Sequence, residues 1–291
     1  MAEYGIAPRG YRLPEATSLG PVRLQVGDLE RSLDYYQHLL GLRVQSRDGS
    51  VASLGPHDDD RSLILLHARP GARPVPRRGT LGLYHFAILL PDRPALGQFV
   101  THLAESDVPA GSADHSVSEA IYLTDPDGLG IEVYVDRPRA SWQHDGRQLH
   151  MTTEPLDIRS LVAAGTGQPW AGMPRGTVMG HVHLHVGDLD RAAAFYHDGL
   201  GLDKVVWTYP GALFMSAGGY HHHLGTNTWS SGALAAEDQA RLLSWEVVLP
   251  RASDAEAAAR SIADAGHEVR NEEGIWTAAD PWGTVVRIIG S

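Results

Sequence analysis

Cysteine is absent from the 291 residues, and this absence narrows the chemistry open to the protein. Disulfides, thiolate nucleophiles and metal sites with cysteine ligands are excluded. A metal ion would have to bind to His, Asp, Glu or water, which favours Fe(II), Mn(II) or Zn(II). The sequence has a single lysine, Lys204, and a formal net charge of −11 without any basic cluster. We therefore expect neither nucleic acid nor an anionic membrane as a partner, because both require clustered Lys and Arg.

Long apolar runs are also missing. No stretch reaches the length of a transmembrane helix, and the first residues lack the basic segment and apolar stretch of a signal peptide. We therefore expect a cytoplasmic protein. Hydrophobic residues make up 43% of the chain and charged residues 20%, which indicates a globular protein with a substantial core.

One sequence pattern is present in both halves of the chain. Val26–Arg31 has the sequence VGDLER, and Val186–Arg191 has the closely similar VGDLDR. Each is followed by a Leu-Gly-Leu motif, at Leu40–Leu42 and Leu200–Leu202. The Asp of each first motif is suited to cap the start of a helix, and the Gly of each second motif is suited to end it. Such repetition indicates a duplicated structural unit.

The patterns of strands and helices predict four such units. The turn Asp125–Gly128 lies near the end of the second unit, and Asp280–Gly283 lies at the same place in the fourth. We therefore expect an α+β fold of four β-α-β-β-β units in two pairs, with curved mixed sheets that form an open cleft. The expected parts are an N-terminal arm (1–19), an N-terminal domain of two units (20–136), a linker (137–179) and a C-terminal domain of two units (180–291).

Strand alternation predicts which side chains face this cleft. Apolar residues alternate with polar ones along several strands, and the polar ones are expected on the open face. They are His85, Tyr122, Glu132, His181, His183, His185, His221 and His223. A lone His on a sheet is more often hydrogen-bonded or solvated than a ligand, and the run 221–223 could be a local hydrogen-bonding cluster. The histidines and Glu132 lie at corresponding positions of different units, on the first or last strand, and this coincidence favours a metal site.

Residues 20–136 and 180–289 resemble the vicinal oxygen chelate superfamily, which includes glyoxalase I, bleomycin-resistance proteins and extradiol ring-cleavage dioxygenases. Within it, the chain is most similar to two-domain proteins of the catechol 2,3-dioxygenase type. The stretches that carry this likeness are Gly82–Ala87, Asp114–Tyr122, Asp125–Glu132 and Gly218–Gly225.

The resemblance implies a role for each candidate residue. His85, Glu132 and His181 would bind Fe(II), or alternatively Mn(II). Catalytic roles fall to Tyr122, His221 and His223, and we expect substrate contacts from His115, His183 and Trp229. Neither sequential pair of units holds all three metal ligands, so the second unit would have to meet the third, within one subunit or between subunits.

The expected function is that of an extradiol ring-cleavage dioxygenase in aromatic hydrocarbon catabolism. It would open a catechol-type diol with O2 at a non-haem Fe(II) site, and its partners would be a small aromatic diol, O2 and further copies of itself in a homo-oligomer. Two alternatives stay open. One is a glyoxalase-type metal lyase or isomerase, for which Gln25 is a nearby candidate for a further ligand. The other is a metal-free protein that binds an aromatic compound, as bleomycin-resistance proteins do.

Overall fold

The four repeated units form as expected, each with one helical segment against one face of its strands. A computed structural model describes residues 4–76, 78–230 and 232–291. The first unit comprises β2 (Val22–Val26), α1 (Leu29–Asp34), η1 (Tyr35–Leu39), β3 (Arg43–Asp48), β4 (Val51–Gly55) and β5 (Ile64–Ala68). The second comprises β6 (Gly82–Leu89), α2 (Arg93–Glu105), β7 (Gly111–Asp114), β8 (Ser118–Thr124) and β9 (Gly130–Asp136).

The C-terminal half repeats this order. The third unit comprises β12 (Val178–His185), α4 (Leu189–Ala193), η3 (Ala194–Gly199), β13 (Asp203–Val206), β14 (Ala212–Ser216) and β15 (Leu224–Asn227). The fourth comprises β16 (Arg241–Leu249), α5 (Ala252–Asp264), β17 (Val269–Glu272), β18 (Ile275–Ala279) and β19 (Val285–Gly290). Outside the units lie β1 (Ser18–Leu19), η2 (Arg139–Ser141), β10 (His144–Asp145), β11 (Gln148–Leu149) and α3 (Ile158–Ala164).

The repeated motifs cap the first helix of each half as predicted. The Asp28 carboxylate accepts a hydrogen bond of 3.1 Å from the backbone N–H of Arg31, and Asp188 accepts the equivalent bond of 2.8 Å. Both helices continue into a π-helical turn, η1 or η3. Gly41 follows η1 with φ of +73°, a left-handed conformation that costs glycine little.

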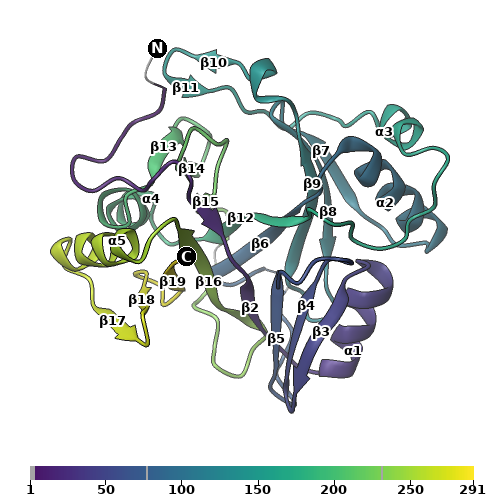
Figure 1. Ribbon diagram of the computed structural model, residues 1–291, viewed down its shortest axis with the longest axis horizontal. Helices are drawn as coiled ribbons and strands as arrows, with labels where there is room; N and C mark the ends of the chain where they lie inside the picture. The colour runs from purple at the N-terminus through teal and green to yellow at the C-terminus, as the bar shows by residue number, and fades with distance from the viewer. Residues whose placement is uncertain (1–3, 77, 231) are drawn as a thin grey trace.

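Each sheet joins one unit of the N-terminal half to one unit of the C-terminal half (Figure 1). Antiparallel pairing of β6 with β12 gives an eight-stranded sheet from the second and third units, in the order β13-β14-β15-β12-β6-β9-β8-β7. Pairing of β2 with β16 joins the first and fourth units in the order β17-β18-β19-β16-β2-β5-β4-β3, and β1 makes this sheet nine-stranded. The meeting of units two and three that the sequence required therefore occurs within one subunit.

The two units of each half are held together by a different set of contacts. The Tyr36 hydroxyl donates to the Asp125 carboxylate over 3.0 Å, linking the first unit to the second. The equivalent bond, from Tyr196 to Asp280, measures 2.9 Å and links the third unit to the fourth. Each unit thus shares a sheet with one unit and is hydrogen-bonded to another. The domain bounds 20–136 and 180–291 stay a prediction.

The hydrophobic core fixes which face of the eight-stranded sheet is open. Phe86, Ile88, Val182 and Leu184 are fully buried on the face that the helices cover. Because side chains alternate along a strand, the polar residues between them point to the other face. The core thus directs the candidate site residues of β6 and β12 into the cleft, as the alternation predicted.

The linker does more than run along the surface. Its residues Leu161 and Met173 are fully buried in the main core, and α3 packs against α2. Another part, Met151, Thr152 and Thr153, lines a cavity together with residues of the eight-stranded sheet. The linker therefore completes the site that the two units form.

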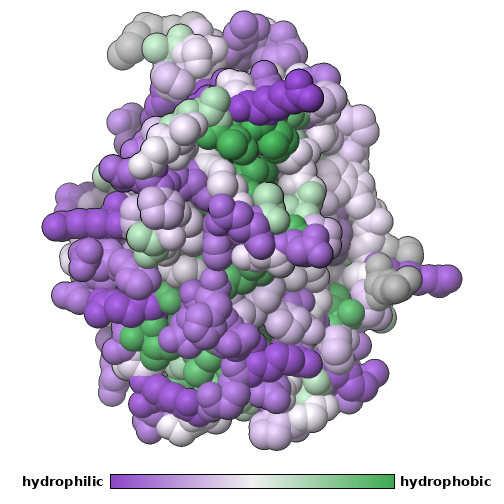
Figure 2. All heavy atoms as spheres, turned by 90° about the vertical axis from the view of Figure 1, so that its right-hand side faces the viewer, coloured by the Kyte–Doolittle hydropathy of each residue, from purple (hydrophilic) through white to green (hydrophobic). Residues whose placement is uncertain are grey.

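The face that carries α1, α2 and α3 is mostly hydrophilic, with separate hydrophobic patches (Figure 2). Within the described part of the chain, each helix is too short or too polar to cross a membrane.

Candidate metal centre and its cavity

Two imidazoles and one carboxylate converge on the open face of the eight-stranded sheet. Nε2 of His85 lies 3.0 Å from Oε2 of Glu132, and Nε2 of His181 lies 3.1 Å from the same oxygen. The two Nε2 atoms are 3.4 Å apart. All three side chains are buried, with exposed fractions of 5% or less. Three Lewis-base atoms thus surround one point, and a cation at that point would satisfy all of them.

Strand register explains this convergence. In the sheet, β6 lies between β12 and β9, and Ala87 of β6 is directly opposite both His181 and Glu132. The small side chain of Ala87 leaves the space between those two residues open. His85 lies two residues along β6 on the same face and reaches the same space.

The protonation states suit metal binding. Burial lowers the pKa of His181 to about 4, against the opposing effect of Glu132. Burial by itself would raise the pKa of Glu132, but His181 and His85 together hold that pKa well below its usual value. A neutral imidazole and an ionised carboxylate are the forms in which these side chains bind metal ions.

A cavity of about 260 Å³ opens directly above this cluster. His85 and Glu132 form its base, and Tyr84, Tyr209, Phe214 and Trp229 supply aromatic walls. Of the described residues that line it, none is Lys or Arg. The cavity can therefore hold a single flat ring against aromatic side chains, and it offers no cation to an anionic substituent.

Tyr122 and His115, both predicted site residues, lie on the cavity wall and are hydrogen-bonded to each other over 2.6 Å. His115 Nδ1 lies 2.6 Å from the backbone carbonyl of Thr152, so this nitrogen must carry the proton. The Tyr122 hydroxyl therefore donates to His115 Nε2, and its oxygen lone pairs stay available to the cavity. Burial and then Glu132 raise the pKa of Tyr122 well above its usual value, so the phenol stays neutral.

His183, predicted to contact substrate, lies on the cavity wall in a fixed tautomer. Asn227 Oδ1 accepts a bond of 3.1 Å from the backbone N–H of Trp229, which fixes the orientation of the amide. Asn227 Nδ2 therefore donates to His183 Nε2 over 2.9 Å. The proton of His183 is then on Nδ1.

Trp229 lies at the mouth of the cavity, with 47% of its surface exposed. Its ring centroid is 5.7 Å from that of His183, and its indole N–H donates to the carbonyl of Pro210 over 3.0 Å. It is therefore placed to cover a ring that enters the cavity.

The histidine run 221–223 differs from the predicted placement. His222 lines the cavity, and its ring centroid is 4.0 Å from that of His181. His221 lies behind it, and neither His221 nor His223 is part of the cavity wall. His223 Nδ1 accepts the backbone N–H of Ala217 over 3.2 Å, and burial lowers the pKa of His223 to about 3. The structure thus brings seven of the nine predicted site residues together at the metal cluster and its cavity, and leaves His221 and His223 outside the cavity wall.

Strand alternation was used to place His221 and His223, but the strand nearest to them, β15, begins only at Leu224. Gly218 and Gly219 both have positive φ, of 63° and 66°, and reverse the chain just before the histidines. Strand alternation therefore does not apply to residues 221–223. The adjacent glycines were the available signal, because such pairs are typical of turns.

The equivalent place in the nine-stranded sheet contains permanent cations instead of histidines. Arg23 lies across from Ser244 in the register, as His183 lies across from His85 in the other sheet. Oε2 of Glu246 is 3.2 Å from an Arg23 nitrogen and 3.3 Å from an Arg287 nitrogen. Two guanidinium groups are ion-paired with this carboxylate, so it is not free to bind a metal ion.

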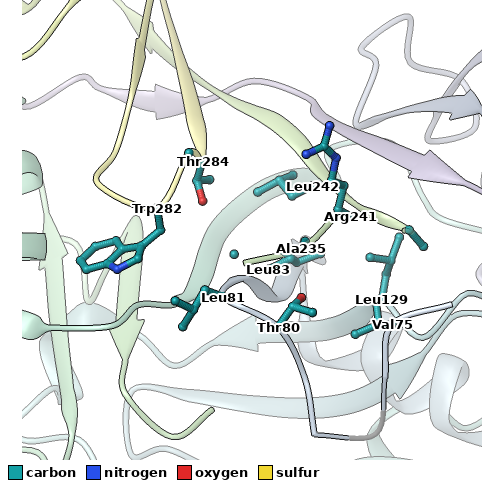
Figure 3. A pocket seen from close by; sticks show the side chains of 13 residues that line it. Val75, Thr80, Leu81, Leu83, Leu129, Ala235, Arg241, Leu242, Trp282 and Thr284 are labelled. Carbon is teal, nitrogen blue, oxygen red and sulfur yellow. The ribbon is translucent and has the colours of Figure 1, made fainter. Parts of the chain in front are cut away.

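A separate small cavity lies where the start of β6 faces the start of β16 (Figure 3). Leu81, Leu83, Leu242 and Trp282 surround it, and its volume is about 40 Å³. This is room for a water molecule or two and not for an aromatic ring.

Comparisons with known proteins agree with this architecture. The model of the Glyoxalase/Bleomycin resistance protein/Dioxygenase superfamily matches residues 18–133 and 178–288. The chain is 42% identical to the catechol-2,3-dioxygenase of Bacillus subtilis (strain 168) over 272 residues, which cover 92% of this chain and 95% of that one.

Solved structures share the fold at low sequence identity. A protein from Bacillus subtilis subsp. subtilis str. 168 has a TM-score of 0.65 and 15% identity, covering 96% of this chain and 86% of that one. Glyoxalase I from Zea mays has a TM-score of 0.56 and 17% identity, covering 94% and 92%.

The duplicated fold and its buried His/Glu/His cluster define a protein of the vicinal oxygen chelate type. The chain belongs to the Glyoxalase/Bleomycin resistance protein/Dioxygenase superfamily.

Proposed function

We propose that the protein is an extradiol ring-cleavage dioxygenase that opens a catechol-type diol with O2 at a non-haem Fe(II) ion. The observation that carries this proposal is the convergence of His85, Glu132 and His181 at the base of an aromatic-lined cavity. The identity of 42% with a catechol-2,3-dioxygenase over nearly the whole chain supports it.

The donor set fits the proposed ion. Two neutral imidazoles and one carboxylate on one side of a cation are typical of non-haem Fe(II) oxygenases, and Mn(II) accepts the same donors. When bound, Fe(II) would supply electrons for the activation of O2 and open coordination positions for the diol. His85, Glu132 and His181 would hold the ion at the closed end of the cavity.

Tyr122 and His115 would orient the diol. Because the Tyr122 proton is engaged with His115, the phenol oxygen can accept a hydrogen bond from a substrate hydroxyl. The carbonyl of Thr152 fixes the His115 ring from behind. This chain of bonds gives the diol one preferred orientation before reaction.

His222 is the group we assign to proton transfer, in place of His221 and His223. Its ring faces the cavity and lies against the ring of His181. Burial, and then the neighbouring imidazoles, lowers the pKa of His222 well below its usual value, so the ring is neutral. A neutral imidazole at this position can accept the proton that a diol hydroxyl releases.

The aromatic walls would hold the ring of the substrate. Phe214 and Tyr209 form one side, and Trp229 lies at the mouth. His183 would contact the substrate through the edge that Asn227 leaves free. With the ring in place, these side chains would keep bulk water away from the reacting carbons.

Oxygen uptake is the test of this proposal. The protein would be loaded with Fe(II) without air, and catechol and O2 would then be added. We expect a yellow ring-fission product with one O2 consumed per catechol, and no product from the Glu132→Ala variant. Loaded protein that retains iron and its fold but consumes no O2 would overturn the proposal. Isomerase activity on a thiol adduct with Ni(II) or Zn(II) would indicate the glyoxalase alternative.

The remaining expectations are part of the same proposal. They are the role in aromatic catabolism, the homo-oligomer and the cytoplasmic location.

A further inference from the structure

Three hydrogen-bonded groups connect the cavity wall to the surface. Nδ1 of His222 lies 2.8 Å from Nδ1 of His221. Nε2 of His221 lies 2.9 Å from Oδ1 of Asp136, whose side chain is 28% exposed. Asp136 is the last residue of β9, the strand that also carries Glu132.

The Asp136 carboxylate determines which nitrogens of His221 and His222 carry protons. A neutral imidazole has one N–H donor and one acceptor, so only one of the two Nδ1 atoms can carry a proton. If His221 carried its proton on Nδ1, its bare Nε2 would face the Asp136 carboxylate at 2.9 Å, with no proton between two acceptors. The proton of His221 therefore lies on Nε2, and His222 donates from Nδ1.

We propose that Asp136 and His221 are positioning residues that hold His222 in the tautomer with its proton on Nδ1. Nε2 of His222 then keeps its lone pair, and no other described residue hydrogen-bonds to it. This inference rests on the proposed function, in which His222 accepts a proton from the diol. Without Asp136, both tautomers of His222 become accessible, and the one with its proton on Nε2 cannot accept.

Two tyrosines next to Asp136 and His221 hold these hydrogen-bonded groups in place. The ring of His221 is fully buried and lies 4.1 Å from the ring of Tyr220, measured between centroids. The Tyr220 hydroxyl donates to Asp136 over 3.2 Å and contacts the hydroxyl of Tyr134 at 2.6 Å. Asp136 is thus held by its strand and by two donors, so its carboxylate stays directed at His221.

Nitrogen NMR measures the tautomer directly. The full-length protein would be labelled with ¹⁵N-histidine and loaded with Zn(II), which is diamagnetic, and the His222 signals assigned by comparison with His222→Gln. We expect Nδ1 of His222 to carry the proton and Nε2 to be bare, with the reverse for His221. A proton on Nε2 of His222, or a doubly protonated His221, would overturn the proposal. This readout is independent of activity.

Kinetics then tests the consequence for turnover. In Asp136→Asn we expect kcat to fall by about 10-fold to 100-fold, the usual effect of losing a partner of an active-site group. KM for catechol and bound iron should not change. Asp145→Asn is the matched control, because Asp145 is also hydrogen-bonded to a histidine, His150, away from the cavity wall, and its kcat should stay within about twofold of wild type.

An unchanged kcat in Asp136→Asn would overturn the positioning role. The two proposals can fail separately. A wild-type protein that consumes no O2 refutes the proposed function, and the NMR spectrum still decides the tautomer.

Discussion

Glu132 is the residue on which the metal centre depends most. A single oxygen of this side chain contacts both histidines, and both contacts lie in a buried place. Its negative charge is the only one in the cluster of three, so it supplies most of the attraction for a cation.

Replacement of this charge tests the ligand set. Glu132→Gln keeps the size of the side chain but removes the charge, so we expect Fe(II) affinity to fall by at least about 100-fold. Iron per protein after dialysis against a graded chelator measures this. Glu119→Gln is the control, because Glu119 is also a buried carboxylate on the neighbouring strand β8 but pairs with Arg93. Full retention of iron by Glu132→Gln would show that the ligands are other residues.

The Tyr122 hydroxyl can be tested in the same way. Tyr122→Phe removes the oxygen that would accept from the diol, and we expect kcat to fall by about 100-fold or more. Bound iron should stay unchanged, since Tyr122 is not in the cluster. Tyr35→Phe is a suitable control, since its hydroxyl donates to the Thr124 carbonyl outside the cavity. Equal turnover in Tyr122→Phe and wild type would remove Tyr122 from the mechanism.

At the scale of single elements, helix capping and strand alternation predicted the structure correctly wherever the chain forms a regular helix or strand. Asp28 and Gly41 were predicted to start and end the first helix, and both do. Alternation placed His85 and Glu132 correctly because β6 and β9 are regular strands with one apolar face. It did not apply to residues 221–223, which precede β15 and follow a reversal at two glycines.

The turn that begins at Asp125 is expected to make the folding stability depend on pH. Asp125 is buried and accepts the Tyr36 hydroxyl and the backbone N–H groups of Asp127 and Leu129. Burial raises the pKa of Asp125 from 3.8 to about 6, although these hydrogen bonds oppose the shift. Between these two values, the folded state binds a proton that the unfolded state has lost.

The proton bound by folded Asp125 determines how stability changes with pH. Asp125 favours folding fully below pH 3.8, and its contribution is lost as the pH rises toward 6. Asp125→Asn keeps the size of the side chain but does not titrate. We therefore expect the stability of the variant relative to wild type to rise by up to about 3 kcal/mol between pH 4 and pH 7. Urea unfolding across this range measures it, and a difference that is constant with pH would contradict the raised pKa.

At the scale of the whole molecule, the pairing of units depends on more than local patterns. All four units have similar strand and helix patterns, so these patterns cannot specify which edges meet. The distribution of His85, Glu132 and His181 indicated that units two and three share a site. The sequence did not show whether these units meet within one subunit. The linker between them has little periodicity, so its path could not be predicted.

Charge at this scale predicts substrate preference. The net charge of −11 repels anions, and the cavity lining has no Lys or Arg among its described residues. We expect kcat/KM for catechol to exceed that for a carboxylated catechol by at least about 10-fold. This ratio should decrease as the salt concentration rises, because salt screens the negative charge of the protein. Steady-state oxygen uptake at low and high ionic strength measures both ratios. A preference for the carboxylated substrate would contradict this account of the cavity.

A crystal structure of the protein loaded with Fe(II) under anaerobic conditions, with anomalous data at the iron edge, is the most direct test of the metal centre. We expect one anomalous peak between His85 Nε2, His181 Nε2 and a Glu132 carboxylate oxygen, at roughly 2 Å from each. Iron at any other place, with these three side chains still hydrogen-bonded to one another, would contradict the account.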